Sequence, residues 1–208
     1  MKLTLWATAA LASTVAAQDQ QYYNISSSPF QLVLKSDNAT LHLTVLGACH
    51  QGAAIEGLCF TGRGINETAT PYTTFYYNIS SYSSTNSFYD NDGLLGWNLN
   101  TTSLLVPSAM RLSKSPTSNV ANAVFSPGWS DPSLVSFDAA GYLYIKATQN
   151  DLVDPVGYWD PPLHVKNWYI CSTLWSSYRY DTLIWKIGLQ GQPQNPACQY
   201  VEVFKMYT

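Results

Sequence analysis

The stretch FQLVLKSDNATLHLTVLG (Phe30–Gly47) decides the fold class, because apolar and polar residues largely alternate along it. Alternation with a period of two places every second side chain on the same face of an extended strand. The short segment Asp37–Ala39 separates two such runs, FQLVLKS (Phe30–Ser36) and TLHLTVLG (Thr40–Gly47). The pattern therefore predicts a β-hairpin with a polar turn.

The same alternation continues to the end of the chain. Further strand candidates lie at Thr73–Ser80, Leu94–Asn100, Ala109–Lys114, Val120–Ser126, Leu134–Asp138, Gly141–Ala147, Trp168–Trp175, Tyr180–Gly188 and Gln199–Tyr207. The segment Thr148–Asn167 interrupts this series with three prolines. It is predicted to be a long loop of the kind that carries binding residues on a rigid scaffold.

Short strands rich in β-branched and aromatic residues predict an all-β fold. Beyond the N-terminal twenty residues, no segment has the 3.6-residue apolar period of a helix. We expect a single domain over residues 18–208, an antiparallel β-sandwich or barrel of the jelly-roll type. A β-trefoil-like fold is the alternative, because a glycine turn followed by a strand of the form L-x-L/I recurs at Asp92–Asn98 and Asp138–Ile145.

The first twenty residues, MKLTLWATAALASTVAAQDQ, have the layout of a secretory signal peptide. Lys2 supplies the basic start, Leu3–Val15 the apolar stretch, and Val15–Ala17 the small residues of a cleavage site. The apolar stretch is too short to span a bilayer. We therefore expect a signal peptide at residues 1–17, cleavage after Ala17, and a secreted extracellular or cell-wall protein without membrane contact.

Charged residues make up only 11% of the chain, and the formal net charge is −3. Because no basic cluster occurs, the chain lacks the electrostatic surface that nucleic-acid binding requires. Hydrophobic residues make up 46%, which is too many for a disordered chain. The composition favours a folded extracellular β-protein, expected as a monomer, with Ser, Thr, Asn and Tyr on its surface.

An even number of cysteines in an exported protein predicts disulfides. The chain has four, so three connectivities are possible, and local pairing is favoured: Cys49–Cys59 with Cys171–Cys198. A zinc site would need two cysteines two to four residues apart, which this chain lacks. Five Asn-x-Ser/Thr sequons predict N-glycosylation of exposed positions, at Asn24, Asn38, Asn66, Asn78 and Asn100.

Residues that could carry catalysis are few. The three histidines have no metal-binding spacing, so neither a metal ion nor a cofactor is expected. Glycoside hydrolysis is the enzymatic alternative, and it needs two carboxylates between about 5 and 9.5 Å apart. Glu202, in a predicted strand, and Glu56, in the loop ACHQGAAIEGLC (Ala48–Cys59), are the candidates. We favour a non-enzymatic role and interpret this loop, with His50, as a disulfide-stapled β-connection.

Sugar binding without catalysis requires only exposed aromatic rings and a few polar groups. The candidates are four aromatic residues in or beside loops, namely Trp129, Tyr158, Trp159 and Trp168. Trp97, Trp175 and Trp185 lie in alternating strands and are predicted to be packing residues.

The run SPFQLVLKSDNATLHLTVLGACHQGAAIEGLC (Ser28–Cys59) resembles the opening of a family of small secreted ascomycete proteins, mostly of unassigned function. The arrangement WYIC…TLIWKIG…NPACQYVEV (168–203) is distantly similar to phialide-type fungal cell-wall proteins. These resemblances imply an extracellular or wall-associated fungal glycoprotein, and they carry over no catalytic residue.

The leading hypothesis is therefore a secreted, N-glycosylated, disulfide-stapled protein that associates with the cell wall or binds glycan without catalysis. A jelly-roll glycoside hydrolase is one alternative. A secreted host-interaction protein of the effector type, which would bind another extracellular protein, is the other.

Overall fold

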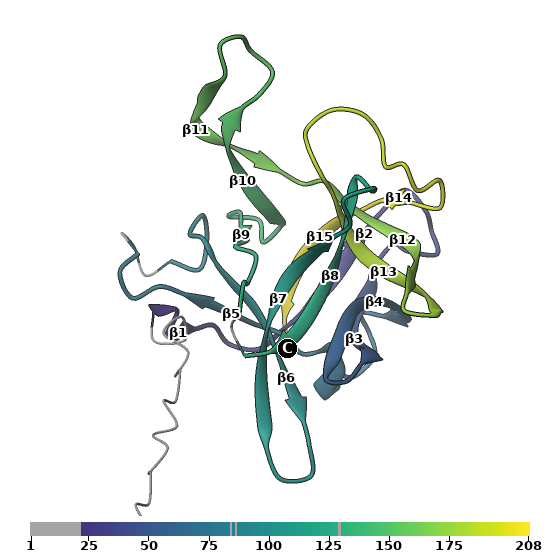
Figure 1. Ribbon diagram of the computed structural model, residues 1–208. Helices are drawn as coiled ribbons and strands as arrows, with labels where there is room; N and C mark the ends of the chain where they lie inside the picture. The colour runs from purple at the N-terminus through teal and green to yellow at the C-terminus, as the bar shows by residue number, and fades with distance from the viewer. Residues whose placement is uncertain (1–21, 84, 86, 129) are drawn as a thin grey trace, which may run out of the picture.

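The chain forms β-strands over most of its length, as the alternating pattern predicted (Figure 1). The computed structural model describes residues 22–83, 85, 87–128 and 130–208, so the predicted signal peptide lies outside the described residues. A short 3-10 helix, η1 (Pro71–Thr73), precedes the fifth strand. The strands are β1 (Ile25–Ser26), β2 (Phe30–Lys35), β3 (Thr44–Gly52), β4 (Ile55–Gly64), β5 (Tyr76–Ile79), β6 (Gly93–Asn100), β7 (Leu105–Lys114), β8 (Val120–Pro127), β9 (Ser136–Phe137), β10 (Leu143–Asn150), β11 (Gly157–Val165), β12 (Trp168–Trp175), β13 (Tyr178–Lys186), β14 (Gln199–Tyr200) and β15 (Glu202–Tyr207).

Most of these strands belong to one large antiparallel sheet in the order β1-β5-β6-β7-β8-β13-β4-β3-β2-β15, with β12 joining β13 to β14. The sheet branches at β8, whose first residues lie opposite β13 and whose later residues lie opposite β4. It is not closed into a barrel. The all-β prediction is confirmed in its β-sandwich form. The barrel form does not describe this sheet, and neither does the trefoil-like alternative, which is built around a closed barrel.

Three strands form a second, smaller sheet in the order β11-β10-β9. Isolated bridges between Tyr142 and Phe204 and between Gly93 and Val135 join it to the large sheet. Beyond these bridges, β10 and β11 continue as a hairpin that projects away from the body of the protein (Figure 1). We call this hairpin, residues 147–163, the arm.

The arm occupies the segment predicted to be a long loop, so that prediction was wrong. Ala147 lies opposite Leu163, and Gln149 lies opposite Tyr158. The register therefore leaves the four residues 159–162 of β11 facing a single residue of β10, so this part of β11 forms an extended β-bulge. Because proline donates no ladder hydrogen bond, β11 can hold its adjacent prolines within this bulge.

The strand expected at Thr40–Gly47 runs instead over Thr44–Gly52, as β3. Asn38 provides the reason, because its carbonyl oxygen accepts hydrogen bonds from the backbone N–H groups of Leu41 and His42, both at 3.0 Å. These bonds make a compact turn where the first half of the strand was expected. The turn still buries Leu41 in the core.

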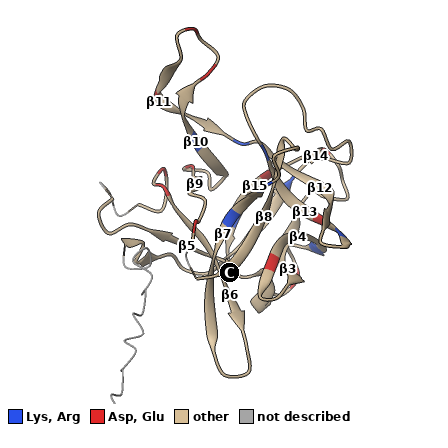
Figure 2. Cartoon of the chain, in the orientation of Figure 1, with Lys and Arg blue, Asp and Glu red and all other residues tan. Residues whose placement is uncertain are grey.

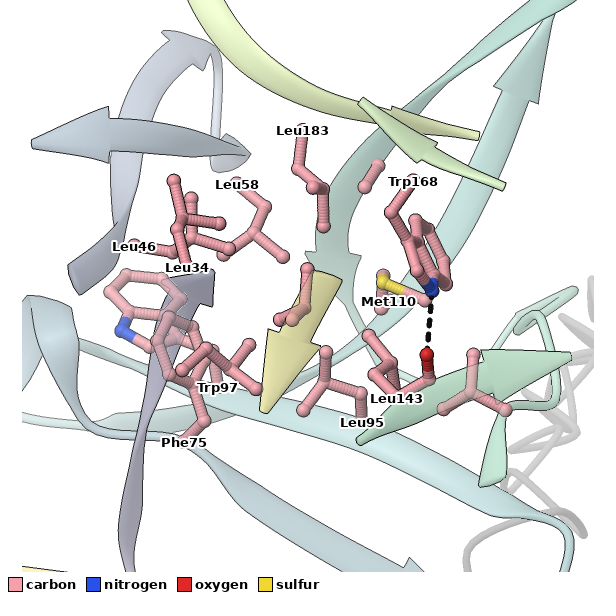
Figure 3. Packing of buried hydrophobic residues seen from close by; sticks show 14 of the residues in the cluster. Leu34, Leu46, Leu58, Phe75, Leu95, Trp97, Met110, Leu143, Trp168 and Leu183 are labelled. Atoms are coloured by element: carbon pink, nitrogen blue, oxygen red, sulfur yellow. Dashed lines mark hydrogen bonds between the residues drawn. The ribbon is translucent and has the colours of Figure 1, made fainter. Parts of the chain in front are cut away.

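One apolar cluster draws on strands of both sheets (Figure 3). From β2 it takes Phe30, Leu32 and Leu34, the alternate residues that the period-two pattern selects. Trp168 of the large sheet meets Leu143 of the small sheet there, and the indole N–H donates to the Leu143 carbonyl at 2.9 Å. Because its polar atom is satisfied, the indole can be fully buried. The core thereby holds the root of the arm against the large sheet.

Candidate functional site

The loop between Cys49 and Cys59 is a β-hairpin, formed by the paired ends of β3 and β4 and closed by the predicted disulfide. His50 and Glu56 are direct cross-strand partners, with Nδ1 and Oε1 3.2 Å apart. The His50 side chain is 74% exposed, whereas that of Glu56 is 9% exposed. This pair is an ordinary cross-strand contact. The interpretation as a stapled connection therefore agrees with the geometry.

Glu56 and Glu202 are not brought together. Their strands, β4 and β15, are separated in the sheet by β3 and β2. Three strand spacings correspond to about 14 Å, which exceeds the separation that either glycosidase mechanism uses. The Glu202 carboxylate is paired instead with the Lys35 ammonium at 3.0 Å. The geometry therefore does not support the proposed carboxylate pair, because Glu202 is held by Lys35 and Glu56 lies beside His50.

The four aromatic candidates do not form a single exposed strip. Trp168 is fully buried in the core, since its side chain points inward from β12. Tyr158 is 84% exposed on the arm, and Trp159, the next residue of β11, is only half-exposed. Trp129 lies outside the described residues. Of the three predicted binding residues that the structure describes, Tyr158 is thus the one that is clearly open to solvent.

Two clefts lie elsewhere on the protein. The larger, about 450 Å³, separates the root of the arm from the loop that follows β13, and we call it the arm cleft. Apolar side chains form most of its lining, with Trp185 on the β13 side and Ile145 and Val165 on the arm side. Polar groups, including Gln149 and Asp151, complete the lining.

The second cleft, about 400 Å³, lies between the β7–β8 hairpin and the end of β12, and we call it the Trp175 groove. The Trp175 side chain is half-exposed beside it. Hydroxyl and amide side chains dominate its lining: Ser113, Ser115, Ser118, Asn122, Ser172, Thr173 and Asn195. Lys114 is the one charged residue among the described residues that line it. The groove therefore offers an aromatic face within a hydrogen-bonding rim whose single described charge is that of Lys114.

Asn122 is the most informative polar group of the Trp175 groove. Its side-chain oxygen is buried and has no hydrogen-bond partner among the described residues. A buried acceptor without a partner costs free energy unless a ligand or water supplies a donor. The Asn195 amide, by contrast, already donates to the Ser172 carbonyl at 3.0 Å. The Asn122 oxygen is therefore an unpaired acceptor beneath the surface of the groove, and a bound hydroxyl group would meet it only after the side chain turned outward.

Sequence reasoning missed both clefts because it assigned Trp175 and Trp185 to the core. One signal for Trp175 was present: it is the last residue of its strand and is followed by the turn Ser176–Ser177. A residue at the end of a strand has fewer neighbours to cover it. Trp185 gives no such signal, because it lies within β13 and packs edge-on against Trp168 with ring centres 4.7 Å apart.

The sequons lie away from both clefts in sequence. All residues that line the two clefts fall between Ser113 and Asn195, beyond the last sequon. Two smaller pockets, by contrast, are lined by sequon asparagines, one by Asn78 and the other by Asn100. Glycans attached at these positions would lie over those pockets, whereas no sequon asparagine lines the arm cleft or the Trp175 groove.

Lys205 of β15 is the most strongly perturbed basic group, and its surroundings are aromatic. Its ammonium lies 4.2 Å from the ring centre of Tyr89, 4.7 Å from that of Phe137 and 5.5 Å from that of Tyr207. It donates to the Phe88 carbonyl at 3.3 Å. Burial lowers the pKa of Lys205 from 10.5 to about 8, and the rings offset part of the lost hydration. Because only 7% of this residue is exposed, we assign it a structural role.

Lys and Arg residues are scattered singly over several strands and do not form a cationic patch in this view (Figure 2). Within the described ranges, no group of three or more His, Cys, Asp or Glu side chains is placed to hold a metal ion. The same ranges contain no helix of the length and apolar character that crossing a bilayer requires.

Comparison with known proteins yields one match. The profile of a family described as a domain of unknown function (DUF7907) matches residues 27–207, which include every strand from β2 to β15 and both clefts. No curated protein and no solved structure matches the chain.

Proposed function

Because this chain belongs to the DUF7907 family, whose function is not known, we propose a function from its own geometry. We propose that it is a secreted, N-glycosylated extracellular or wall-associated protein of fungal type that binds a neutral polysaccharide in the Trp175 groove without catalysing a reaction. The half-exposed indole of Trp175 within a rim of hydroxyl and amide groups is the observation that carries this proposal.

The chemistry of the groove suits a neutral sugar. The apolar face of a sugar ring stacks on an aromatic side chain, while its hydroxyl groups need donors and acceptors around the ring. Trp175 supplies the aromatic face, and the hydroxyl and amide side chains of the rim supply donors and acceptors. No described carboxylate lines the groove, so it holds no acid or base for glycoside hydrolysis. Binding without cleavage is the activity that this set of groups supports.

Two further features support an extracellular setting. Disulfides persist in oxidising compartments, and this chain has two, with no free cysteine among the described residues. The five sequons all precede the residues that line the Trp175 groove. None of the residues that line the groove is a sequon asparagine, so no glycan is attached within it.

Retention on insoluble chitin, β-glucan and cellulose tests the proposal. We expect the wild-type protein to be retained on at least one of them, Trp175→Ala to lose about tenfold or more in affinity, and Trp175→Phe to recover part of it. Tyr158→Ala is the matched control, since it removes an exposed ring from the arm. Failure of the wild-type protein to bind any of the three, or loss of binding in Tyr158→Ala but not in Trp175→Ala, would contradict the proposal.

Contact with another extracellular protein is a second candidate function, favoured by the tip of the arm. Leu152, Val153, Val156 and Tyr158 are exposed there by 48%, 48%, 60% and 84%. Exposed apolar side chains gathered on a projecting hairpin are typical of protein contacts. A photo-crosslinking residue at position 158, compared with the same residue at Tyr178, tests this. One partner captured only from position 158 would support it, whereas equal capture at both positions would not.

A further inference from the structure

The arm cleft has the size and position of a small-molecule site. Its volume of about 450 Å³ lies within the range of clefts that enclose drug-sized ligands. One side is the root of the arm, where Ile145 and Val165 are direct cross-strand partners. The other side is the segment that follows β13, represented by Leu189 and Gln190. The cleft is therefore bounded by two separate parts of the chain.

The floor of the cleft is apolar and firmly placed. Ile145 and Trp185 both pack against the buried core cluster. The Trp185 ring is also held edge-on against Trp168, whose indole is fixed by its bond to the Leu143 carbonyl. A floor of this kind is present before any ligand binds, so binding requires little reorganisation.

The loop wall is held in place by a buried charge. Lys186 is 1% exposed, and its ammonium donates to the carbonyl of Gly188 at 3.0 Å and to that of Gln190. The Asn167 side chain donates to the same Gly188 carbonyl at 2.8 Å. Burying an ammonium group is costly unless its donors are satisfied, and here the loop carbonyls satisfy them. The loop that forms one wall of the cleft is thus fixed rather than free to collapse into it.

The polar rim of the cleft favours ligands that donate hydrogen bonds. The Gln149 amide donates to the Asp151 carboxylate at 2.6 Å, and this leaves the other carboxylate oxygen and the Gln149 carbonyl oxygen as acceptors. No lysine or arginine is among the described lining residues, and the ammonium of Lys186 is occupied by the loop. A carboxylate at the rim and no cation beside it disfavour an anionic ligand.

From these features we propose that the arm cleft binds a small, neutral, largely apolar molecule that carries at least one hydrogen-bond donor, such as a hydroxyl or arylamine group. Its apolar part lies on Ile145, Val165 and Trp185, and its donor meets the rim at Gln149 and Asp151. This site is distinct from the Trp175 groove, with which it shares no lining residue, and it does not depend on the proposed sugar binding.

Fluorescence titration with N-phenyl-1-naphthylamine, a neutral apolar probe with one N–H donor, tests the proposal on the full secreted chain. We expect saturable binding with one site. The anionic probe 1-anilinonaphthalene-8-sulfonate should bind at least fivefold more weakly, because of the rim carboxylate. Absence of saturable binding of the neutral probe, or preference for the anionic probe, would overturn the proposal.

Two neighbouring substitutions locate the probe. Ala147 lines the cleft, whereas Thr148 is exposed and follows it in β10, where successive side chains point to opposite faces. Ala147→Phe should fill the cleft and weaken probe binding tenfold or more, while Thr148→Phe should leave it unchanged. Leu189→Asp, on the loop wall, is the second blocking variant if Ala147→Phe folds poorly. Equal affinity in wild type and both blocking variants would place the probe elsewhere and refute the assignment.

Discussion

Two lysines are almost fully buried, and neither is paired with a carboxylate among the described residues. Lys186 satisfies its ammonium with loop carbonyls, whereas Lys205 lies among aromatic rings. A buried charge lacking a counter-charge keeps its ionised form only at a cost in free energy. Each of these residues therefore links protonation to the stability of the fold.

Lys205 predicts a rise in stability on the alkaline side of neutrality. Its pKa is about 8 in the folded state, compared with 10.5 in the unfolded chain. Below pH 8 both states hold the proton, so stability does not change with its titration. Between pH 8 and about 10 the unfolded state holds more protons than the folded state, and the free energy of unfolding therefore increases with pH. Urea unfolding at half-unit steps from pH 7 to 11 measures this.

The tyrosines around Lys205 determine the pH at which this rise in stability ends. Burial raises the pKa of Tyr77 and of Tyr207 above 10. Their contribution to the free energy of unfolding is complete below pH 10 and is lost above it. The reason is that the unfolded chain releases its phenolic protons at a lower pH than the folded protein does. Lys205→Met should reduce the rise above pH 8 and keep the fall above pH 10, and the part of the rise that remains belongs to Lys186, whose pKa burial also lowers. A variant that kept the whole rise would show that Lys205 does not cause it.

At Gly93, the first residue of β6, we expect any added side chain to clash with its neighbours. A Cβ atom there would lie 2.6 Å from the Asn78 carbonyl oxygen and 2.7 Å from the ring of the buried Tyr77. Neither neighbour can move freely, because one is strand backbone and the other is fixed by its hydroxyl group, which donates to the Val135 carbonyl at 2.8 Å. Gly93→Ala should therefore lower the free energy of unfolding by about 2 kcal/mol.

Gly64→Ala is the control for this substitution. A Cβ atom at Gly64 meets nothing within 4 Å. Chemical denaturation should show a change of less than about 0.5 kcal/mol for this variant. Equal losses in the two variants would mean that backbone preference, and not the contact with Tyr77, decides the effect.

At the scale of elements, the strands of the core were predictable and the arm was not. In Phe30–Ser36 the large apolar residues recur with a period of two because Phe30, Leu32 and Leu34 share the face of β2 that meets the core cluster, although the residues between them are buried as well. The arm meets solvent on much of its surface, so burial imposes no period on its sequence. The prolines at 161 and 162 also indicated a loop, and only the bulge in β11 reconciles them with a strand.

The candidate site was less predictable than the fold for a related reason. Trp168 and Trp175 are at opposite ends of the same strand, β12, yet the first is fully buried and the second is half-exposed. The two residues are an odd number of positions apart and so lie on opposite faces of β12, but alternation alone does not say which face is covered. Their exposure is decided by what other parts of the chain cover, namely the small sheet over Trp168 and open space beside the β7–β8 hairpin at Trp175. This information lies in the tertiary arrangement.

The two disulfides predict unequal effects. Cys171–Cys198 closes a loop of 27 residues and Cys49–Cys59 one of 10 residues. In the chain-entropy model these loops correspond to about 3.5 and 2.7 kcal/mol of stability. The paired strands β3 and β4 also hold the shorter loop, so its loss should cost less than this value. Thermal and urea unfolding of the two double Cys→Ala variants should show that the variant lacking Cys171–Cys198 is the less stable of the two.

The longer disulfide also bears on the arm cleft, whose wall lies within the loop that it closes. The Cys171→Ala, Cys198→Ala variant should therefore bind N-phenyl-1-naphthylamine more weakly, while the Cys49→Ala, Cys59→Ala variant should bind as wild type does. Weaker binding in the second variant alone would contradict this link between the loop and the cleft.

At the scale of the whole molecule, the sequons and the clefts are separated along the chain, but the five sequons are not equivalent. Asn24, Asn66 and Asn100 are exposed. The Asn38 side-chain nitrogen, to which a glycan would be attached, instead donates to Gln199. Asn78 lies in the middle of β5, half-buried, and its side-chain oxygen is fully enclosed.

Site-resolved mass spectrometry of the protein purified from a eukaryotic expression host should therefore find high occupancy at Asn24, Asn66 and Asn100 and low occupancy at Asn38 and Asn78. A glycan on Asn78 would have to leave β5 through a half-buried position, so chains that carry it should fold poorly and be depleted from the folded protein. Asn78→Gln should then change neither yield nor apparent mass, whereas Asn66→Gln should lower the mass by one glycan. Full occupancy at Asn78 would instead mean that β5 is open to solvent and that the small pocket beside it is covered by sugar in the native protein.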